Sequence, residues 1–146
     1  MRILVLGLVI LSGCILAPVM KGVQDAGITK NDRAVKLGEN LREFKEALYW
    51  GQTLRLNSYL LEEGKESFTT AYKGVGRTER LTETKVEETE ISEDGYSAKV
   101  RMMVRYYRIP HYTVVERVDT HDWKYEDGWK IASVAVGDEG NTSPLR

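Results

Sequence analysis

Two histidines are the side chains of this chain of 146 residues that could most readily move protons at neutral pH. His121 lies beside Asp122 and two residues after Asp119. A neighbouring carboxylate raises the pKa of an imidazole, which is the arrangement that a general base uses. The alternative is a solvated strand end, where alternating charged side chains face water. Because a base also needs a pocket and an oriented partner, the sequence favours a solvated His121.

Other chemistry finds less support in the sequence. His111 follows Pro110 in an expected hairpin loop, where an exposed histidine needs no function. Neither histidine has further ligands at a spacing that suits a metal ion. No glycine-rich phosphate loop, serine nucleophile motif or P-loop is present. The sequence therefore assigns no catalytic residue, no metal site and no cofactor.

The single cysteine, Cys14, follows an apolar run and two small residues. Met1 and Arg2 give a positive start, and residues 3–11 are apolar apart from Gly7. This is the three-part layout of a secretory signal. As a helix the run would extend about 14 Å, which is well short of a hydrocarbon core of about 30 Å.

The tetrapeptide Leu11-Ser12-Gly13-Cys14 closely resembles the lipobox of bacterial lipoproteins. The resemblance implies that the signal peptidase recognises Leu11, Ser12 and Gly13, that residues 1–13 are removed, and that Cys14 carries diacylglycerol and often an acyl (palmitate-type) chain. Ile15 stands where an aspartate would retain a lipoprotein at the inner membrane. The resemblance therefore implies a lipid anchor in the cell envelope, at the outer membrane and facing the periplasm.

Two other interpretations of this segment stay open. Residues 3–20 carry no charge and reach the lower limit for an uncleaved membrane anchor, although Pro18 makes this segment a poor helix. A plain cleaved signal followed by a chance cysteine is the other alternative. Cleavage signals prefer a small residue where Leu11 stands, so the lipobox interpretation is favoured.

Composition then indicates one modest domain. Removing residues 1–13 takes away Arg2 alone, so 20 basic residues remain against 22 acidic ones, a formal charge of −2. This charge does not favour a nucleic acid as partner. We expect a flexible tether at 14–31, where Pro18, Gly22 and Gly27 interrupt any period, one folded domain at 32–136, and a flexible tail at 137–146.

Hydrophobic periodicity changes once along the expected domain. Asp32 is expected to cap a helix over 33–50, and shorter helices are expected from Thr53 and over 65–72. After Gly76 the period becomes two, which predicts strands over 78–91, 96–107, 112–125 and 129–136. Most tyrosines are expected to pack within this sheet. Helices followed by an antiparallel meander of about four strands predict the α+β class.

The third strand contains a conflict of parity. Val114 and Val118 lie on one face, whereas Trp123 and Tyr125 lie on the other. A regular strand cannot bury both sets, so we expect a β-bulge between Val118 and Asp122 that bends the sheet around the long helix. The acidic run 83–90 is expected to be a solvated strand whose charges discourage edge pairing.

The order of these elements over 33–136 resembles the nuclear transport factor 2-like superfamily. Three segments carry the likeness: FKEALYWGQTLRLNSYLLEEGKESF at 44–68, SEDGYSAKVRMMVRY at 92–106 and DWKYEDGWKI at 122–131. The resemblance implies a curved, mostly antiparallel sheet around a long helix, forming a cone, and an exposed sheet on which a homodimer could form. The superfamily includes isomerases, dehydratases and epoxide hydrolases, and also members that only bind or assemble. No catalytic pattern of those enzymes can be carried over onto this chain.

Together these features favour a non-catalytic, membrane-anchored envelope lipoprotein that binds a partner protein or a small apolar ligand. The alternative is an anchored enzyme of isomerase or hydrolase type that uses the cone cavity. An open cavity with convergent carboxylate or imidazole groups would favour the enzyme. An interior filled by Trp, Phe and Leu side chains would favour the binding protein.

Overall fold

The computed structural model describes residues 29–144. Leu11, Ser12, Gly13, Cys14 and nearly all of the expected tether lie outside this range. Within it, the helices are all too short or too polar to cross a lipid bilayer.

The long helix α2 (Lys30–Tyr49) begins with a reciprocal cap. The backbone N–H of Asp32 donates to Thr29 Oγ1 at 3.1 Å, and the backbone N–H of Thr29 donates to Asp32 Oδ2 at 3.1 Å. Two backbone donors that the helix leaves unpaired are thereby satisfied. The helix starts before the expected position because Thr29 is the cap and Asp32 is its partner in the first turn. Its buried apolar face consists of Leu37, Leu41, Phe44, Ala47 and Leu48.

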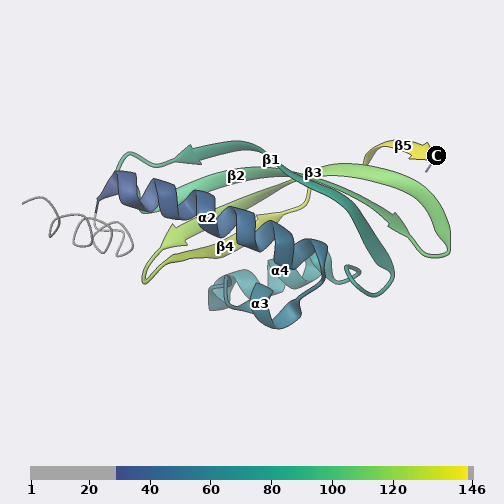
Figure 1. The fold of residues 1–146 in the computed structure, drawn as a ribbon, viewed down its shortest axis with the longest axis horizontal. Helices are drawn as coiled ribbons and strands as arrows, with labels where there is room; N and C mark the ends of the chain where they lie inside the picture. The colour runs from purple at the N-terminus through teal and green to yellow at the C-terminus, as the bar shows by residue number, and fades with distance from the viewer. Residues whose placement is uncertain (1–28, 145–146) are drawn as a thin grey trace, which may run out of the picture.

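Three short elements follow α2 and fold under its C-terminal end (Figure 1): α3 (Thr53–Asn57), the 3₁₀ turn η1 (Glu62–Gly64) and α4 (Lys65–Tyr72). Gly51 ends α2 with a φ of 63°, a conformation that glycine adopts without strain. Gly64 lies so close to the sheet that a Cβ there would be 2.4 Å from the carbonyl oxygen of Ile131. This close approach brings η1 and α4 against strand β4.

The strands form one antiparallel sheet in the order β1-β2-β3-β4, which confirms the α+β class (Figure 1). Their bounds are Glu79–Ile91 for β1, Ser97–Arg108 for β2, His111–Tyr125 for β3 and Trp129–Ala135 for β4. The β2–β3 hairpin extends well beyond the layer of helices. The sheet therefore has a covered half, against α2 and α4, and a projecting half.

A fifth strand, β5 (Gly140–Pro144), pairs with the first half of β3, in a segment that the sequence analysis assigns to a flexible tail. A side-chain anchor precedes this strand. Tyr106 Oη donates to Glu139 Oε1 at 2.6 Å, and Arg108 also binds the Glu139 carboxylate. The polar composition of 137–146 concealed this attachment, because it depends on partners that lie about thirty residues earlier.

The core lies between α2 and the face of the sheet that α2 covers. Phe44 is fully buried and packs edge-to-face against Trp123 and His121. The ring centroids lie 5.5 Å apart for Trp123 and 5.6 Å apart for His121. Trp129 is also fully buried, and its indole N–H donates to the backbone carbonyl of Arg33 at 2.7 Å. Aromatic packing thus fills the space that the curved sheet encloses.

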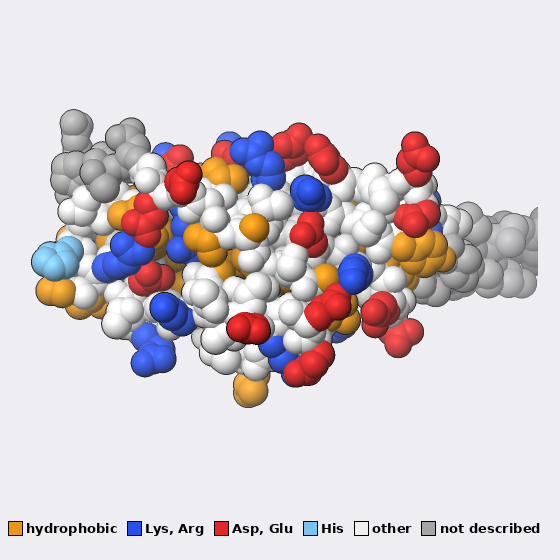
Figure 2. Space-filling model, turned by 180° about the vertical axis from the view of Figure 1, so that it is seen from behind, with side chains coloured by type: hydrophobic (Ala, Val, Ile, Leu, Met, Phe, Trp, Pro, Cys, Tyr) orange, Lys and Arg blue, Asp and Glu red, His pale blue; other side chains and the backbone are white. Residues whose placement is uncertain are grey.

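The opposite face of the sheet carries cross-strand ion pairs. Arg105 binds Glu83 of β1 at 3.0 Å and Glu116 of β3 at 2.6 Å, and Arg101 binds Glu88 at 3.1 Å. Seen from behind, the surface shows red and blue side chains interleaved, with orange ones scattered between them (Figure 2). The acidic residues of β1 are therefore partners of basic residues on β2.

The expected bulge between Val118 and Asp122 is wrong. β3 pairs with β2 without interruption from Val115 to Lys124. The irregularity lies in the pairing of β3 with β4, where Ala132 is the additional residue, on β4. Val114 and Val118 do not lie on the core face of β3, because the alternate positions that face the core carry mostly polar side chains. The core-facing residues are Val115, Arg117, Asp119, His121 and Trp123.

Candidate functional site

A cluster of four polar side chains lies inside the domain: Tyr72, Arg117, Asp119 and His121. The alternation of β3 directs its three members to the core face, and Tyr72 comes from the last turn of α4. Arg117 Nε lies 3.0 Å from Asp119 Oδ1, and Arg117 Nη2 donates to the carbonyl of Ala71 at 2.8 Å. Tyr72 Oη and His121 Nε2 are 2.8 Å apart. The cluster therefore ties α4 to the sheet.

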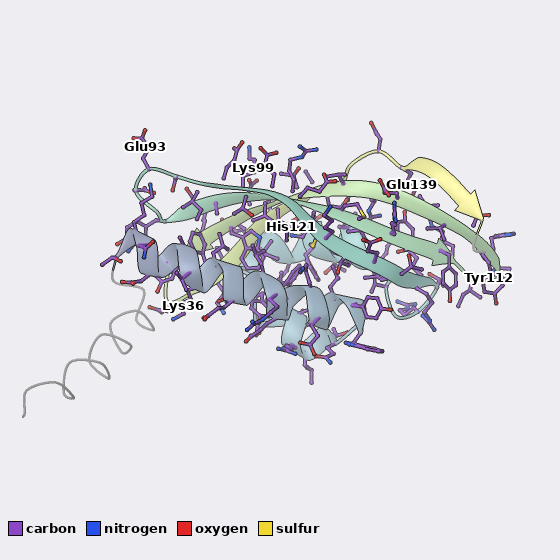
Figure 3. All side chains as sticks on the ribbon, turned by 45° about the horizontal axis from the view of Figure 1, so that its top comes forward. Lys36, Glu93, Lys99, Tyr112, His121 and Glu139 are labelled. Atoms are coloured by element: carbon purple, nitrogen blue, oxygen red, sulfur yellow. The ribbon has the colours of Figure 1, made fainter. Side chains whose placement is uncertain are left out.

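His121 is wholly buried, so the expectation of a solvated strand position is wrong. Figure 3 shows it in the layer between the sheet and α2. Burial lowers the pKa of His121 to about 3, and the positive charge of Arg117 acts in the same direction. Burial also raises the pKa of Tyr72 well above its ordinary value, with a further contribution from Asp119. At neutral pH the pair is a neutral imidazole hydrogen-bonded to a neutral phenol.

Access decides what this cluster can do chemically. Phe44, Trp123 and Trp129 have no exposed surface and occupy the interior around it. In the described part of the chain, His121 Nδ1 and Trp123 Nε1 are the buried side-chain atoms that have no hydrogen-bond partner. A substrate has no path to the imidazole in this arrangement. Among the described side chains, no group of three or more acidic, histidine or cysteine residues is placed to hold a metal ion.

The accessible features lie just outside this cluster, at the loop between α4 and β1, residues 73–78, which we term the α4–β1 loop. An apolar pocket of about 350 Å³ opens on one side of it, and Leu48, Leu56, Phe68, Tyr72 and Val75 contribute to its walls. A basic pocket of about 390 Å³ opens on the other side, and Thr70, Thr78, Lys73, Arg77, Arg108 and Arg117 contribute to its walls. Lys73 and Arg77 line both pockets.

The α4–β1 loop has a closed backbone. The carbonyl of Gly74 accepts the N–H groups of Arg77, Thr78 and Glu79 at 3.0, 2.9 and 2.8 Å. Gly76 has a φ of 77°, and its N–H donates to the carbonyl of Glu79 at 3.1 Å. These bonds fix the positions from which Lys73 and Arg77 extend.

The cations of the basic pocket differ in how they are paired. Arg108 binds Glu79 at 3.1 Å and also Glu139, whose pKa falls to about 2 because Arg108 and Tyr106 donate hydrogen bonds to it. Arg117 is paired with Asp119. Within residues 29–140, no hydrogen bond or ion pair engages the side chains of Lys73 and Arg77. The two exposed cations at the shared rim are thus available for a ligand.

Hydrophobic periodicity did not predict this site, because the loop has no apolar repeat of its own. The signal that could have found it is the run Lys73-Gly74-Val75-Gly76-Arg77-Thr78, in which two cations and a hydroxyl flank two glycines. The structure shows in addition that the carbonyl of Gly74 accepts the hydrogen bonds that close this loop.

The remaining candidates lie apart from both pockets. His111 is exposed at the β2–β3 hairpin, as expected. Tyr112 lies at the tip of that hairpin, far from His121 (Figure 3), and is 61% exposed. Tyr106 is buried and Tyr125 is half-buried, which agrees with packing in the sheet, whereas Tyr96 is exposed.

Compared with known proteins, the chain matches no family model and no curated sequence. Its fold is an α+β arrangement of helices packed on an antiparallel sheet.

Proposed function

We propose that this chain is an envelope lipoprotein, anchored through lipid on Cys14, whose single domain binds a ligand without catalysing a reaction. The observation that carries the non-catalytic part is the complete burial of His121 against Tyr72. The interior that an enzyme of isomerase or hydrolase type would use for its substrate is occupied by the domain's own aromatic side chains.

We further propose that the domain is nuclear transport factor 2-like. A long helix, shorter helices and four antiparallel strands follow one another along the chain, in the order that this resemblance implies. The helices lie against one face of the sheet, as in a cone. This support concerns architecture, and the proposed function depends on the pockets rather than on the likeness.

Lipid attachment and the position of α2 fit together. Fourteen residues lie between Cys14 and Thr29, the N-cap of α2, and an extended chain of this length spans at most about 50 Å. The domain can therefore face the aqueous compartment, with its pockets accessible, while the acylated end stays in the membrane. Two acyl chains suffice for stable membrane residence.

Binding is assigned to the apolar pocket beside the α4–β1 loop. Its volume of about 350 Å³ falls within the range of small-molecule sites, about 300–1,000 Å³. Its walls combine aliphatic and aromatic side chains with the polar side chains of Thr53, Asn57, Thr69, Lys73 and Arg77, which would orient a bound molecule.

The test uses the full chain in nanodiscs of zwitterionic lipid, with labelled methyl groups read by NMR and hexanol as a neutral probe. Hexanol is expected to shift the methyl signals of Leu56 and Val75, which line the pocket, and to leave the methyl signal of Val35 on exposed α2 surface unchanged. Equal shifts at all three positions, or none, would contradict a binding pocket here.

A further inference from the structure

We infer that the α4–β1 loop binds an amphipathic anion: an apolar group enters the apolar pocket, and a carboxylate or phosphate lies against Lys73 and Arg77. This inference rests on the proposed binding function and adds the chemical class of the ligand.

The apolar part of the ligand would contact side chains that already belong to the core. Leu56, Phe68 and Tyr72 are 5–7% exposed, so each already forms part of the core and presents only one side to the pocket. A short alkyl chain or ring placed there would remove this remaining apolar surface from water. Because the wall belongs to the core, it is present before the ligand arrives.

The basic pocket carries an excess of positive charge. The chain as a whole has a formal charge of −1, yet four cations line the basic pocket, with Glu79 as the acidic residue among them. Glu79 and Glu139 are bound by Arg108, and Asp119 is bound by Arg117. Four cations thus face three carboxylates, a net charge of +1, and among these four cations Lys73 and Arg77 are the two that no carboxylate of the described residues binds. An anion would complete the arrangement through charge-assisted hydrogen bonds.

Hydrogen bonds of the loop fix the backbone positions from which these two side chains extend. Three amides converge on the carbonyl of Gly74, so the loop has little freedom to rearrange. A Cβ on Gly74 would lie 2.5 Å from Glu79 Cδ, so a larger residue would displace the carboxylate that binds Arg108. A site that is ordered before binding loses less conformational entropy when the ligand binds.

The apolar pocket and the basic pocket share a rim, and this determines the class of ligand. Lys73 and Arg77 line both pockets, so one molecule that occupies the apolar pocket has its polar end beside them. A neutral apolar molecule would leave these cations unpaired, and an inorganic anion would leave the apolar walls in contact with water. An amphipathic anion satisfies both.

The test again uses methyl NMR of the full chain in zwitterionic nanodiscs, with hexyl phosphate, hexanol and inorganic phosphate as probes. Hexyl phosphate is expected to shift Leu56 and Val75 at a concentration at least about tenfold lower than hexanol does, because it adds charge-assisted bonds. Inorganic phosphate should leave both methyl signals unchanged. Equal affinity for hexyl phosphate and hexanol would overturn the anion inference while leaving the binding function intact. No shift with any probe would count against both.

Variants separate this site from general attraction of an anion to a basic surface. Lys73→Gln and Arg77→Gln are each expected to weaken hexyl phosphate binding about tenfold and to leave hexanol binding unchanged. Lys85→Gln, at an exposed cation of β1, is the matched control and should bind like the unaltered chain. The inference fails if the control weakens binding as much as the two site variants do.

Two sources could supply such an anion, a membrane lipid headgroup or a free amphipathic molecule. Nanodiscs that contain phosphatidylglycerol distinguish them. If the lipid is the source, it competes, and hexyl phosphate binds more weakly in these discs than in zwitterionic ones. If a free molecule is the source, the affinity is the same in both. Either result supports the shared chemistry, provided that Arg77→Gln still lowers the affinity in zwitterionic discs.

Discussion

Tyr72 Oη and His121 Nε2 lie 2.8 Å apart and join the end of α4 to the middle of β3, across 49 residues of sequence. Both side chains are buried, and His121 is wholly so. The bond places an ionisable imidazole in the core, where its charged form is strongly disfavoured. The pair therefore couples folding to pH.

Unfolding is expected to become easier as the pH falls below about 6.5. The pKa of His121 is about 3 in the folded domain against 6.5 for an ordinary histidine, so the unfolded chain binds the additional proton between these values. The contribution of His121 to the free energy of unfolding is therefore fully present above pH 6.5. It falls by about 1.4 kcal/mol per pH unit below that value, which is a loss of about 2 kcal/mol at pH 5. Denaturant unfolding at pH 7 and pH 5 measures this difference.

The matched variants for this pH effect are His121→Gln and His111→Gln. The glutamine amide can still bond Tyr72 but does not titrate, so the loss between pH 7 and pH 5 should be smaller by most of this amount. His111 is exposed, and its replacement should leave the slope as it is in the unaltered chain. An unchanged slope in His121→Gln would mean that another group carries the pH dependence.

Tyr72→Phe is expected to destabilise the domain by about 1–3 kcal/mol, because a buried imidazole nitrogen loses its hydrogen-bond partner while the ring packing remains. Tyr112→Phe removes the same hydroxyl from a side chain that is 61% exposed and should change stability little. Thermal unfolding of both variants provides the comparison. Equal effects would show that the Tyr72 hydroxyl is not part of a stabilising bond.

Periodicity predicted α2 and β2 well because each has an apolar face of its own. Leu37, Leu41, Phe44 and Leu48 recur at helical spacing and are all buried, and the even positions of β2 alternate as predicted. The start of α2 differed from the prediction, because Thr29 is the cap and Asp32, the predicted cap, is its partner in the first turn.

The polar interior could not be predicted by the same reasoning. The sequence favoured a solvated strand end at His121. The groups that allow this part of β3 to be buried come from α4, where Ala71 supplies an acceptor to Arg117 and Tyr72 supplies a hydroxyl beside His121. Burial of charge depends on partners, and partners distant in sequence are invisible to a local pattern. The same holds for Glu139, whose partners are on β2.

Trp129→Ala is expected to destabilise the domain by about 3–5 kcal/mol, or to prevent folding. The indole is fully buried and its N–H donates to the carbonyl of Arg33, so the substitution leaves a cavity against α2 and removes a hydrogen bond that joins β4 to this helix. Trp50→Ala is the control, because that indole is 68% exposed. Circular dichroism and thermal unfolding of the two variants measure the contrast, and similar melting temperatures would contradict the assigned packing.

Glu139→Gln is expected to loosen β5 without unfolding the sheet. The carboxylate binds Arg108 and accepts the Tyr106 hydroxyl immediately before the strand, and the amide cannot keep the ion pair. Hydrogen exchange of the backbone amides of 140–143 should become faster, while exchange in β4 stays the same. If exchange in 140–143 does not change, the pairing with β3 holds β5 independently of this anchor.

The last prediction concerns Cys14, where the mature protein is expected to begin and to carry lipid. The apolar run is too short to span a membrane, the small pair Ser12-Gly13 suits the peptidase, and the chain has no second cysteine with which Cys14 could form an intramolecular disulfide. Intact mass and membrane fractionation should give an acylated chain starting at residue 14. In Cys14→Ser both the acyl mass and the processing should be lost. Ile15→Asp should keep the lipid and move the protein from the outer to the inner membrane. If Cys14→Ser has the mass and membrane residence of the unaltered chain, residues 3–20 anchor the protein by themselves and the lipid assignment is wrong.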